Sequence, residues 1–287
     1  MRVLVIGQSG QVAQSLLERG PAADAVVVAC GRPDTDLTCE TSLARALADN
    51  APDVVVNAAA YTAVDAAEDD EAAALALNAT GPGMLAQLCA AKGLPLVHIS
   101  TDYVFDGRLN RPYREDDPTG PRSAYGRTKL AGEEAVLSSG ARAIVARTAW
   151  VYSPFGKNFV KTMLRVGAER DQLKVVADQL GNPTSALDIA DAILRLCTAR
   201  EAWPEGGTVV HLTASGEASW HEFAEAIFAA AGLSPQVLAI ATHEYPTPAQ
   251  RPANSRLDGA RLEETFGIRL PDWRDSLPDV VARIRST

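Results

Sequence analysis

The sequence predicts an α/β fold built on a doubly wound parallel sheet. Short runs of β-branched residues alternate with longer Ala/Leu-rich runs of helical period across the first half of the chain, a pattern typical of βαβ units. The runs expected as strands are continuously apolar, which is typical of parallel strands covered on both faces. The first run also ends in a glycine-rich turn that opens a helix. Together these observations predict a Rossmann-type sheet followed by a smaller α/β module.

The first 150 residues hold the regular part of this pattern. The expected strands are residues 2–6, 25–29, 53–57, 94–100 and 143–147. The expected helices lie near residues 11–19, 40–49, 66–92 and 122–138. Residues 72–91 carry no charge, but polar residues, Gly and Pro interrupt them, so we expect a buried helix there rather than a membrane span.

Beyond residue 150 the alternation loosens, which predicts a second module. Strands are expected near residues 174–177 and 208–212, and helices near 157–168, 186–199 and 219–231. Residues 242–256 are rich in Pro, Arg and polar residues, which indicates a long loop that crosses the surface or a ligand. We therefore expect one domain over residues 1–150, rejoined by part of 174–215, and a second mainly over 151–287.

Composition narrows the classes of partner. The 287 residues include 36 acidic and 27 basic side chains, for a formal net charge of −9, so general attraction to nucleic acid or an anionic membrane is not expected. The four cysteines show no CxxC pair or zinc spacing, and a chain of this size needs no disulfide, which favours a cytoplasmic location. The apolar residues 3–6 are stopped by Gly7 after too few residues for a secretory signal.

The turn after the first expected strand reads Gly7-Gln8-Ser9-Gly10-Gln11-Val12-Ala13. Glycines at such a turn let the backbone approach a pyrophosphate, and the helix N-terminus supplies N–H donors. A tight turn without a ligand is the alternative. We expect this turn to bind a dinucleotide through Gly7, Ser9, Gly10, Gln11 and Val12.

The end of the second expected strand indicates which dinucleotide is bound. It leads into Gly31-Arg32, without the acidic residue that accepts hydrogen bonds from a ribose 2′-hydroxyl. Arg32 can pair with a 2′-phosphate, so NADPH is expected in preference to NADH, with a solvated surface arginine as the alternative. Asp36 and Leu37 follow closely and are expected to flank the adenine.

Tyr125 and Lys129 are four residues apart and therefore share one face of an expected helix. A neighbouring ammonium is expected to lower the pKa of the phenol from about 10 toward neutral pH, which makes Tyr125 a proton donor to a developing alkoxide. Thr101 follows the fourth expected strand, where open α/β sheets bind ligands. Convergence of the two hydroxyls on a carbonyl predicts a nicotinamide-dependent reductase, and an exposed helical Tyr/Lys pair is the alternative.

These residues resemble the extended short-chain dehydrogenase/reductase family. The resemblance is carried by the turn at residues 7–13, by Asn57-Ala58-Ala59-Ala60, by Thr101 and by Tyr125 with Lys129. Longer blocks are similar to the dTDP-4-dehydrorhamnose reductases within that family. They lie at residues 57–65, 100–107, 147–152, 178–184 and 251–255.

The resemblance implies a reaction and a set of site residues. The reaction is reduction of the 4-keto group of dTDP-4-dehydro-L-rhamnose to dTDP-L-rhamnose by NADPH or NADH, and the second domain binds the nucleotide sugar. The implied catalytic residues are Thr101, Tyr125 and Lys129, with Lys129 also on the nicotinamide ribose. Implied cofactor contacts come from Ala58, Ala59, Ala60 and Tyr61. Implied substrate contacts come from Val64, Thr101, Asp102, Tyr103 and Trp150 around the hexose and from Asn158 and Arg251 nearer the nucleotide, with core packing as the alternative for Trp150.

Departures from the family pattern leave several points open. Ala13 replaces a common third glycine, which is tolerable because alanine is nearly as small. Some members dimerise around a magnesium ion held by glutamates, but no clearly matching acidic trio is present, so no metal is expected and a monomer or a homodimer stays open. Another nucleotide-sugar enzyme of this fold, such as an epimerase, is an alternative function. A non-catalytic NAD(P)-binding regulatory subunit is another, against which Thr101, Tyr125 and Lys129 together argue.

Overall fold

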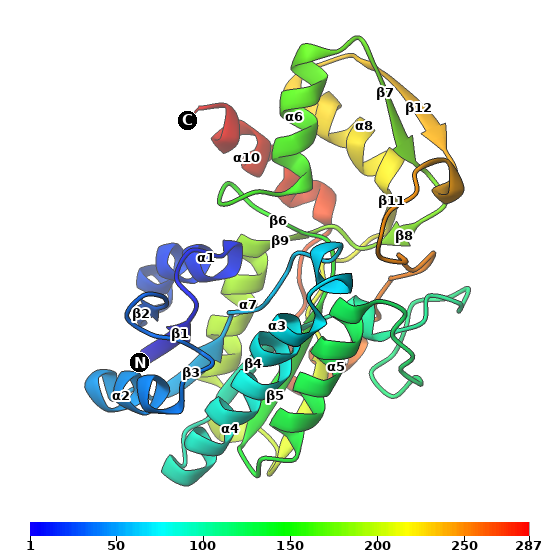
Figure 1. Cartoon of the computed structure of the whole chain (residues 1–287). Coiled ribbons are helices and arrows are strands. Elements are labelled where there is room, and N and C mark those ends of the chain that lie inside the picture. Colours follow the sequence, from blue (N-terminus) through cyan, green and yellow to red (C-terminus); the bar gives the residue numbers. More distant parts are fainter. Residues whose placement is uncertain (287) are drawn as a thin grey trace.

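A six-stranded parallel sheet is the largest element of the computed structural model, which describes residues 1–286. Its strands are β1 (Arg2–Ile6), β2 (Val26–Cys30), β3 (Val54–Asn57), β4 (Leu96–Thr101), β5 (Ala143–Thr148) and β10 (Gly207–His211). Their spatial order is β10-β5-β4-β3-β1-β2 (Figure 1), and each neighbouring pair is parallel. The order reverses between β1 and β3, and ligands of open α/β sheets bind at the carboxyl ends beside such a point.

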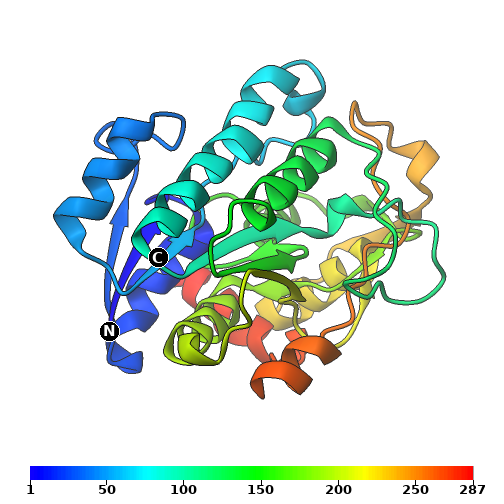
Figure 2. The ribbon, with the colours of Figure 1, turned by 90° about the horizontal axis from the view of Figure 1, so that it is seen from below.

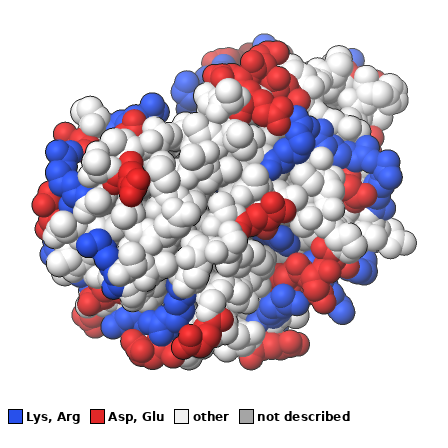
Figure 3. All heavy atoms as spheres, turned by 60° about the horizontal axis from the view of Figure 1, so that its bottom comes forward, with Lys and Arg blue, Asp and Glu red and all other residues white. Residues whose placement is uncertain are grey.

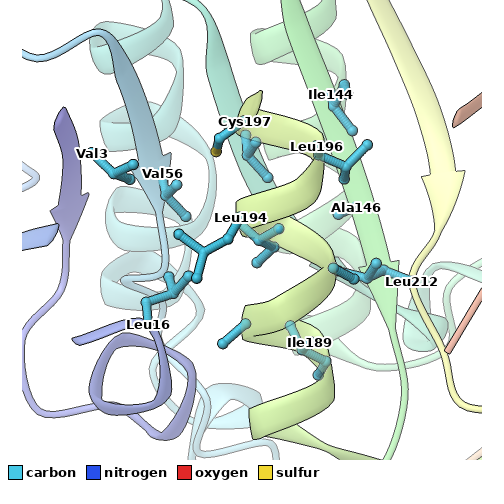
Figure 4. Close-up of a cluster of buried hydrophobic side chains, with 14 of the residues drawn as sticks. Val3, Leu16, Val56, Ile144, Ala146, Ile189, Leu194, Leu196, Cys197 and Leu212 are labelled. Carbon is cyan, nitrogen blue, oxygen red and sulfur yellow. The ribbon is translucent and has the colours of Figure 1, made fainter. Parts of the chain in front are cut away.

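Helices cover both faces of this sheet (Figure 2). Side chains alternate along a strand, so Val3 and Val5 of β1 point toward α1 (Gln11–Arg19) and α7 (Ala186–Thr198), as Figure 4 shows for Val3. Leu4 and Ile6 point to the opposite face. That face is covered by α2 (Glu40–Asn50), α4 (Gly81–Lys92) and α5 (Ala124–Leu137). The central strands are apolar throughout because both faces are buried.

A second group of elements surrounds a separate hydrophobic core. It contains α6 (Phe159–Glu169), α8 (Trp220–Ala231), α10 (Trp273–Arg285) and the parallel pair of β7 (Gln172–Val176) and β12 (Gln236–Ile240). Figure 1 shows this group above the sheet. Phe223, Ile227 and Trp273 lie at its centre and are at most 1% exposed.

Short strands and turns complete the chain. The short strands are β6 (Val151–Tyr152), which pairs with β9 (Thr184–Ser185), and β8 (Leu180–Gly181), which pairs with β11 (Ala218–Ser219). The remaining helices and turns are α3 (Glu71–Leu75), α9 (Ala260–Phe266), a π-helical turn η3 (Ala76–Thr80), and the 3₁₀ turns η1 (Gly20–Ala23), η2 (Ala66–Glu68), η4 (Asp102–Val104), η5 (Arg200–Ala202) and η6 (Thr242–Glu244). Although α7 and β10 follow residue 151, they pack with the large sheet. The division into residues 1–150 and 151–287 stays a prediction.

Two expectations about local structure are wrong. The strand expected at residues 25–29 was predicted to be covered on both faces, but β2 is the edge of the sheet and Val26 is 58% exposed. The single helix expected at residues 66–92 is interrupted, because the Asp70 side chain accepts a hydrogen bond from Ala73 N and begins a new helix there. A hydrophobic run in the sequence does not indicate whether a strand lies at the edge or the centre of the sheet. Nor does it show where a capping side chain divides a helix.

Three further features concern the surface charge, membrane-spanning helices and metal-binding groups. In Figure 3, acidic and basic side chains are interspersed around a wide uncharged area on one face. Within residues 1–286, no helix has both the length and the hydropathy needed to cross a membrane. The same residues contain no group of three or more His, Cys, Asp or Glu side chains placed to hold a metal ion.

Candidate active site

A cavity of about 580 Å³ lies at the carboxyl ends of the central strands. It is bounded by the segments that follow β1, β3, β4 and β5, by α5, and by α6 and α8 from the second group. The predicted site residues that line it are Ser9, Gly10, Gln11, Val12, Ala58, Ala59, Ala60, Val64, Thr101, Asp102, Tyr103, Tyr125, Lys129 and Trp150. The structure therefore brings the glycine-rich turn and the Thr/Tyr/Lys set to one space.

The glycine-rich turn has the geometry of a close backbone approach. Gly7 has φ +108°, in the left-handed region, and a Cβ there would lie 3.0 Å from Ala59 N and 3.1 Å from the carbonyl carbon of Ala58. Only glycine fits this position without strain. Gly10 is the N-cap of α1 and supplies no capping side chain, so the first turn of α1 presents backbone N–H groups at the cavity wall.

Tyr125 and Lys129 lie on one face of α5, as their spacing predicts, but the expected pKa shift of the phenol is wrong. Burial raises the pKa of Tyr125 to about 12, the Asp102 carboxylate adds to the shift, and the Thr101 hydroxyl opposes it. Lys129 is 2% exposed, and its Nζ donates to Ile99 O at 2.7 Å. Burial lowers the pKa of Lys129 to about 8, while Glu133 opposes that change. Desolvation therefore outweighs the expected effect of the ammonium on the phenol.

Thr101 and Asp102 form a buried hydrogen-bonded pair at the end of β4. Thr101 Oγ1 donates to Asp102 Oδ1 at 2.9 Å, and Asp102 Oδ2 has no hydrogen-bond partner within residues 1–286. Burial raises the pKa of Asp102 to about 7, although the bond from Thr101 lowers it. Tyr103, two residues further on, places its ring edge-on to Tyr125 with centroids 5.5 Å apart.

A buried ion pair that the sequence did not predict lies behind the part of the cavity formed by β4 and α5. Arg147 of β5 donates to Glu133 of α5 at 2.7 Å and 2.9 Å, and both side chains are at most 4% exposed. Ser100, which lines the cavity, donates to the same carboxylate. The i, i+4, i+8 series of Tyr125, Lys129 and Glu133 on one helical face was the available signal. Sequence spacing alone did not indicate that Arg147 would lie opposite.

Aromatic residues form the cavity wall on the side of the second group of elements, around α6 and α8. Trp150 has φ +47°, and its Nε1 donates to Ser255 Oγ at 3.0 Å. The Trp220 ring stacks on Trp150 with centroids 3.5 Å apart and planes 5° apart, and Phe159 lies against Trp220. Trp220, Phe159 and Lys157 also line the cavity. They were not predicted, because α6, α8 and the turn before α6 are brought to the cavity only by tertiary packing.

Several predicted cofactor residues lie outside the cavity lining. Arg32 is exposed, and its carbonyl oxygen accepts from Gln8 Nε2 at 2.7 Å. Asp36 accepts from the backbone and hydroxyl of Thr38, which hold its pKa below the usual value. Leu37 is 3% exposed. Tyr61 is held through its backbone by the Asn78 side chain.

The two residues expected near the nucleotide are also outside the lining, and each has partners within the chain. Arg251 forms a two-pronged pair with Asp65 at 2.8 Å and 2.9 Å, which spans from the loop at residues 245–256 to the segment after β3. Asn158 is the N-cap of α6, and its Nδ2 donates to Gln11 Oε1 at 3.0 Å. This contact ties the first turn of α1 to the start of α6.

Comparison with known proteins places these features in a family. The sequence model of the RmlD substrate binding domain matches residues 1–286. The dTDP-4-dehydrorhamnose reductase of Sinorhizobium fredii is 48% identical over 284 residues, covering 96% of this chain and 95% of that protein. A probable dTDP-4,6-dihydroxy-2-methyloxan-3-one 4-ketoreductase of Streptomyces antibioticus is 43% identical over 288 residues, covering 98% of this chain and 96% of that protein. The crystal structure of a Bacillus anthracis dTDP-4-dehydrorhamnose reductase in complex with NADP is similar, with a TM-score of 0.92 and 33% identity over 98% of each chain.

Proposed function

The chain belongs to the RmlD substrate binding domain family, and we propose that it reduces dTDP-4-dehydro-L-rhamnose to dTDP-L-rhamnose in dTDP-rhamnose biosynthesis. NADPH is the preferred reductant and NADH the alternative. One observation carries the proposal: Thr101, Tyr125 and Lys129 open onto the same cavity as the glycine-rich turn at the start of α1. Such a cavity can hold a dinucleotide and a carbonyl substrate side by side.

The residues around the turn fit a dinucleotide. A side chain at position 7 would fill the approach between the turn and Ala58–Ala59, and the uncapped N-terminus of α1 has N–H donors for a pyrophosphate. Ser9, Gly10, Gln11 and Val12 would hold the phosphates, and Ala58, Ala59 and Ala60 the next part of the dinucleotide. Arg32, exposed after β2, would pair with the 2′-phosphate, with Asp36 and Leu37 near the adenine and Tyr61 beside Ala60. The bound NADPH supplies a hydride to the carbonyl carbon of the substrate.

Tyr125 gives its proton to the developing alkoxide at O4 of the sugar. A phenol whose pKa is near 12 stays protonated at neutral pH, which is the form that a reduction requires. The ammonium of Lys129, held by Ile99 O, lines the same cavity as Tyr125 and would stabilise the negative charge that develops as the proton leaves. It would also bind the nicotinamide ribose.

Thr101 is the second donor to the carbonyl oxygen. Its hydroxyl hydrogen is directed at Asp102 Oδ1 when that carboxyl is ionised. A proton on Asp102 reverses the direction of this hydrogen bond and leaves the Thr101 hydrogen free for the sugar. Because burial raises the pKa of Asp102 to about 7, both arrangements are accessible near neutral pH.

In this proposal the substrate lies between Thr101, Tyr125 and Lys129 on one side of the cavity and the aromatic residues Trp150, Trp220 and Phe159 on the other. Val64, Asp102, Tyr103 and Trp150 line the cavity and would surround the hexose, with the apolar Trp150 ring suited to a deoxysugar methyl. Arg251 and Asn158 would contact the nucleotide end of the substrate. A phosphate of the nucleotide would replace the Asp65 carboxylate as the partner of the Arg251 guanidinium.

The domain assignment and location follow from the same proposal. Residues 1–150 with part of 174–215 would bind the dinucleotide, which agrees with the packing of α7 and β10 on the large sheet. Residues 151–287 would mainly bind the nucleotide sugar. The four cysteines are free thiols, which supports a reducing, cytoplasmic setting.

The proposal is tested by following NADPH consumption with dTDP-4-dehydro-L-rhamnose generated in situ. We expect stoichiometric NADPH oxidation and formation of dTDP-L-rhamnose. The matched control is the 4-keto substrate of the Streptomyces antibioticus relative, which distinguishes the two ketoreductase specificities. Interconversion of sugars without net NADPH consumption would indicate an epimerase, and NADPH binding with no turnover of either sugar would indicate a regulatory protein.

A further inference from the structure

Gly181 lies at a position that shapes the aromatic wall. It ends β8, which pairs with β11 on one side. On the other side, Leu180 N donates to Ala253 O and Ser255 N donates to Leu180 O, each at 2.8 Å. The backbone around Gly181 is therefore held between β11 on one side and residues 253–255 on the other; Figure 1 shows β8 beside β11.

The indole of Trp150 lies between Gly181 and Trp220. A Cβ at position 181 would lie 2.5 Å from Nε1 and 2.7 Å from Cζ2 of Trp150, and still closer to Cε2, which lies between them. Being nearest to the middle one of three consecutive ring atoms, this Cβ would sit over the ring face rather than beyond its edge. The parallel ring of Trp220, 3.5 Å away, occupies the other face. The indole therefore fills a slot that is one ring thick.

The orientation of Trp150 is restrained at its backbone and at its ring. Its carbonyl accepts from Thr184 N at 3.1 Å, and its Nε1 donates to Ser255 Oγ at 3.0 Å. The backbone φ of +47° is unfavourable for a tryptophan. Such a conformation persists only where the surroundings determine it, and it occurs most often at functional sites.

We propose that Gly181 is a specificity-determining residue for the sugar end of the substrate. Because glycine has no side chain, it leaves open the slot in which the Trp150 indole lies at the cavity wall. This inference rests on the proposed function. A methyl group at position 181 presses on the indole, and Trp220 blocks movement away from it. The indole then shifts along its own plane, which changes the part of the cavity that takes the hexose and leaves the glycine-rich turn unchanged.

The experiment compares wild-type protein with Gly181→Ala and with a matched control, Gly167→Ala. Gly167 lies in α6, and a Cβ there meets the ring of Phe228 inside the second core, away from the cavity. Both variants add one methyl group against an aromatic ring, so the control reports the effect of crowding alone. For each protein we would measure kcat, KM for dTDP-4-dehydro-L-rhamnose, and the Kd of NADPH, dTDP and dTDP-L-rhamnose.

In Gly181→Ala we expect KM for the ketosugar and Kd for dTDP-L-rhamnose to rise by about tenfold or more, the scale of one misplaced methyl group in a pocket. The Kd of NADPH and of dTDP should change by less than about twofold in both variants. A second substitution, Trp220→Ala in the Gly181→Ala background, should recover part of the loss, because it removes the ring that blocks movement of the indole away from position 181. Equal KM in the two glycine variants, or equal weakening of dTDP and dTDP-L-rhamnose, would overturn the inference. Absence of turnover and of sugar binding in the wild-type protein would instead refute the proposed function.

Discussion

Replacing Asp102 with Asn should remove a pH-dependent cost to stability. Asp102 is 2% exposed, and burial raises its pKa from 3.8 to about 7. At about 1.4 kcal/mol per pKa unit, a shift of about 3 units corresponds to a cost of about 4 kcal/mol once the carboxyl is ionised in both states. Because the folded pKa is raised, stability is complete below the unfolded pKa and is lost as the pH rises to the folded pKa near 7.

The asparagine variant keeps an oxygen that accepts from Thr101 but cannot ionise. Its free energy of unfolding, relative to wild type, should therefore increase by about 2 kcal/mol between about pH 5.5 and about pH 8.5, since about 1.5 pH units of that interval lie below the folded pKa. Urea unfolding followed by tryptophan fluorescence at the two pH values measures this difference. Asp49→Asn, on the exposed face of α2, is the control. A difference between variant and wild type that does not grow with pH would refute the assignment of Asp102 as a buried carboxyl with a raised pKa.

Three further predictions follow from the site and the layer behind it. Tyr125→Phe should lower kcat by roughly 10²-fold or more while the Kd of NADPH is unchanged, with Tyr245→Phe, at 61% exposure, as the control; steady-state kinetics with unchanged kcat would contradict the proton-donor role. Arg32→Ala should weaken NADPH more than NADH in a binding titration, because only NADPH has the 2′-phosphate, and equal weakening would make Arg32 an ordinary surface residue. Glu133→Gln should lower the free energy of unfolding by about 3–5 kcal/mol by leaving Arg147 buried without its anionic partner. Glu169→Gln in the exposed pair with Arg165 should lower it by less than about 1 kcal/mol, and similar losses in the two variants would contradict the buried ion pair.

The central strands were predictable because burial on both faces makes their sequence continuously apolar. The strand expected at residues 2–6 coincides with β1, and those expected near β3, β4 and β5 differ from them only at their ends. By contrast, β12 and α10 were not predicted. β12 is a partly exposed strand that pairs with β7, more than 60 residues away, and α10 contains Pro278 and many charged residues. Their stability comes from packing in the second core rather than from a local pattern.

The chemistry of the candidate site was likewise only partly predictable from the sequence. Spacing along the helix was sufficient to place Tyr125 and Lys129 on one face, but not to show that burial would dominate the pKa of Tyr125. The Trp150 slot depends on Gly181, Trp220 and Ser255, which approach only through tertiary pairing. Sequence motifs therefore indicated the groups that we propose to react, whereas the residues packed around them could be identified only from the three-dimensional arrangement.

Hydride delivery to the sugar is tested by deuterium transfer from NADPH that carries deuterium in place of both hydrogens at C4 of the nicotinamide. The sugar product would be isolated after reaction with dTDP-4-dehydro-L-rhamnose and examined by NMR. We expect dTDP-L-rhamnose with deuterium at C4 of the sugar, because the hydride is delivered to that carbon while Tyr125 protonates its oxygen. A product with no deuterium at C4, or with the label at another carbon, would refute the proposed reduction.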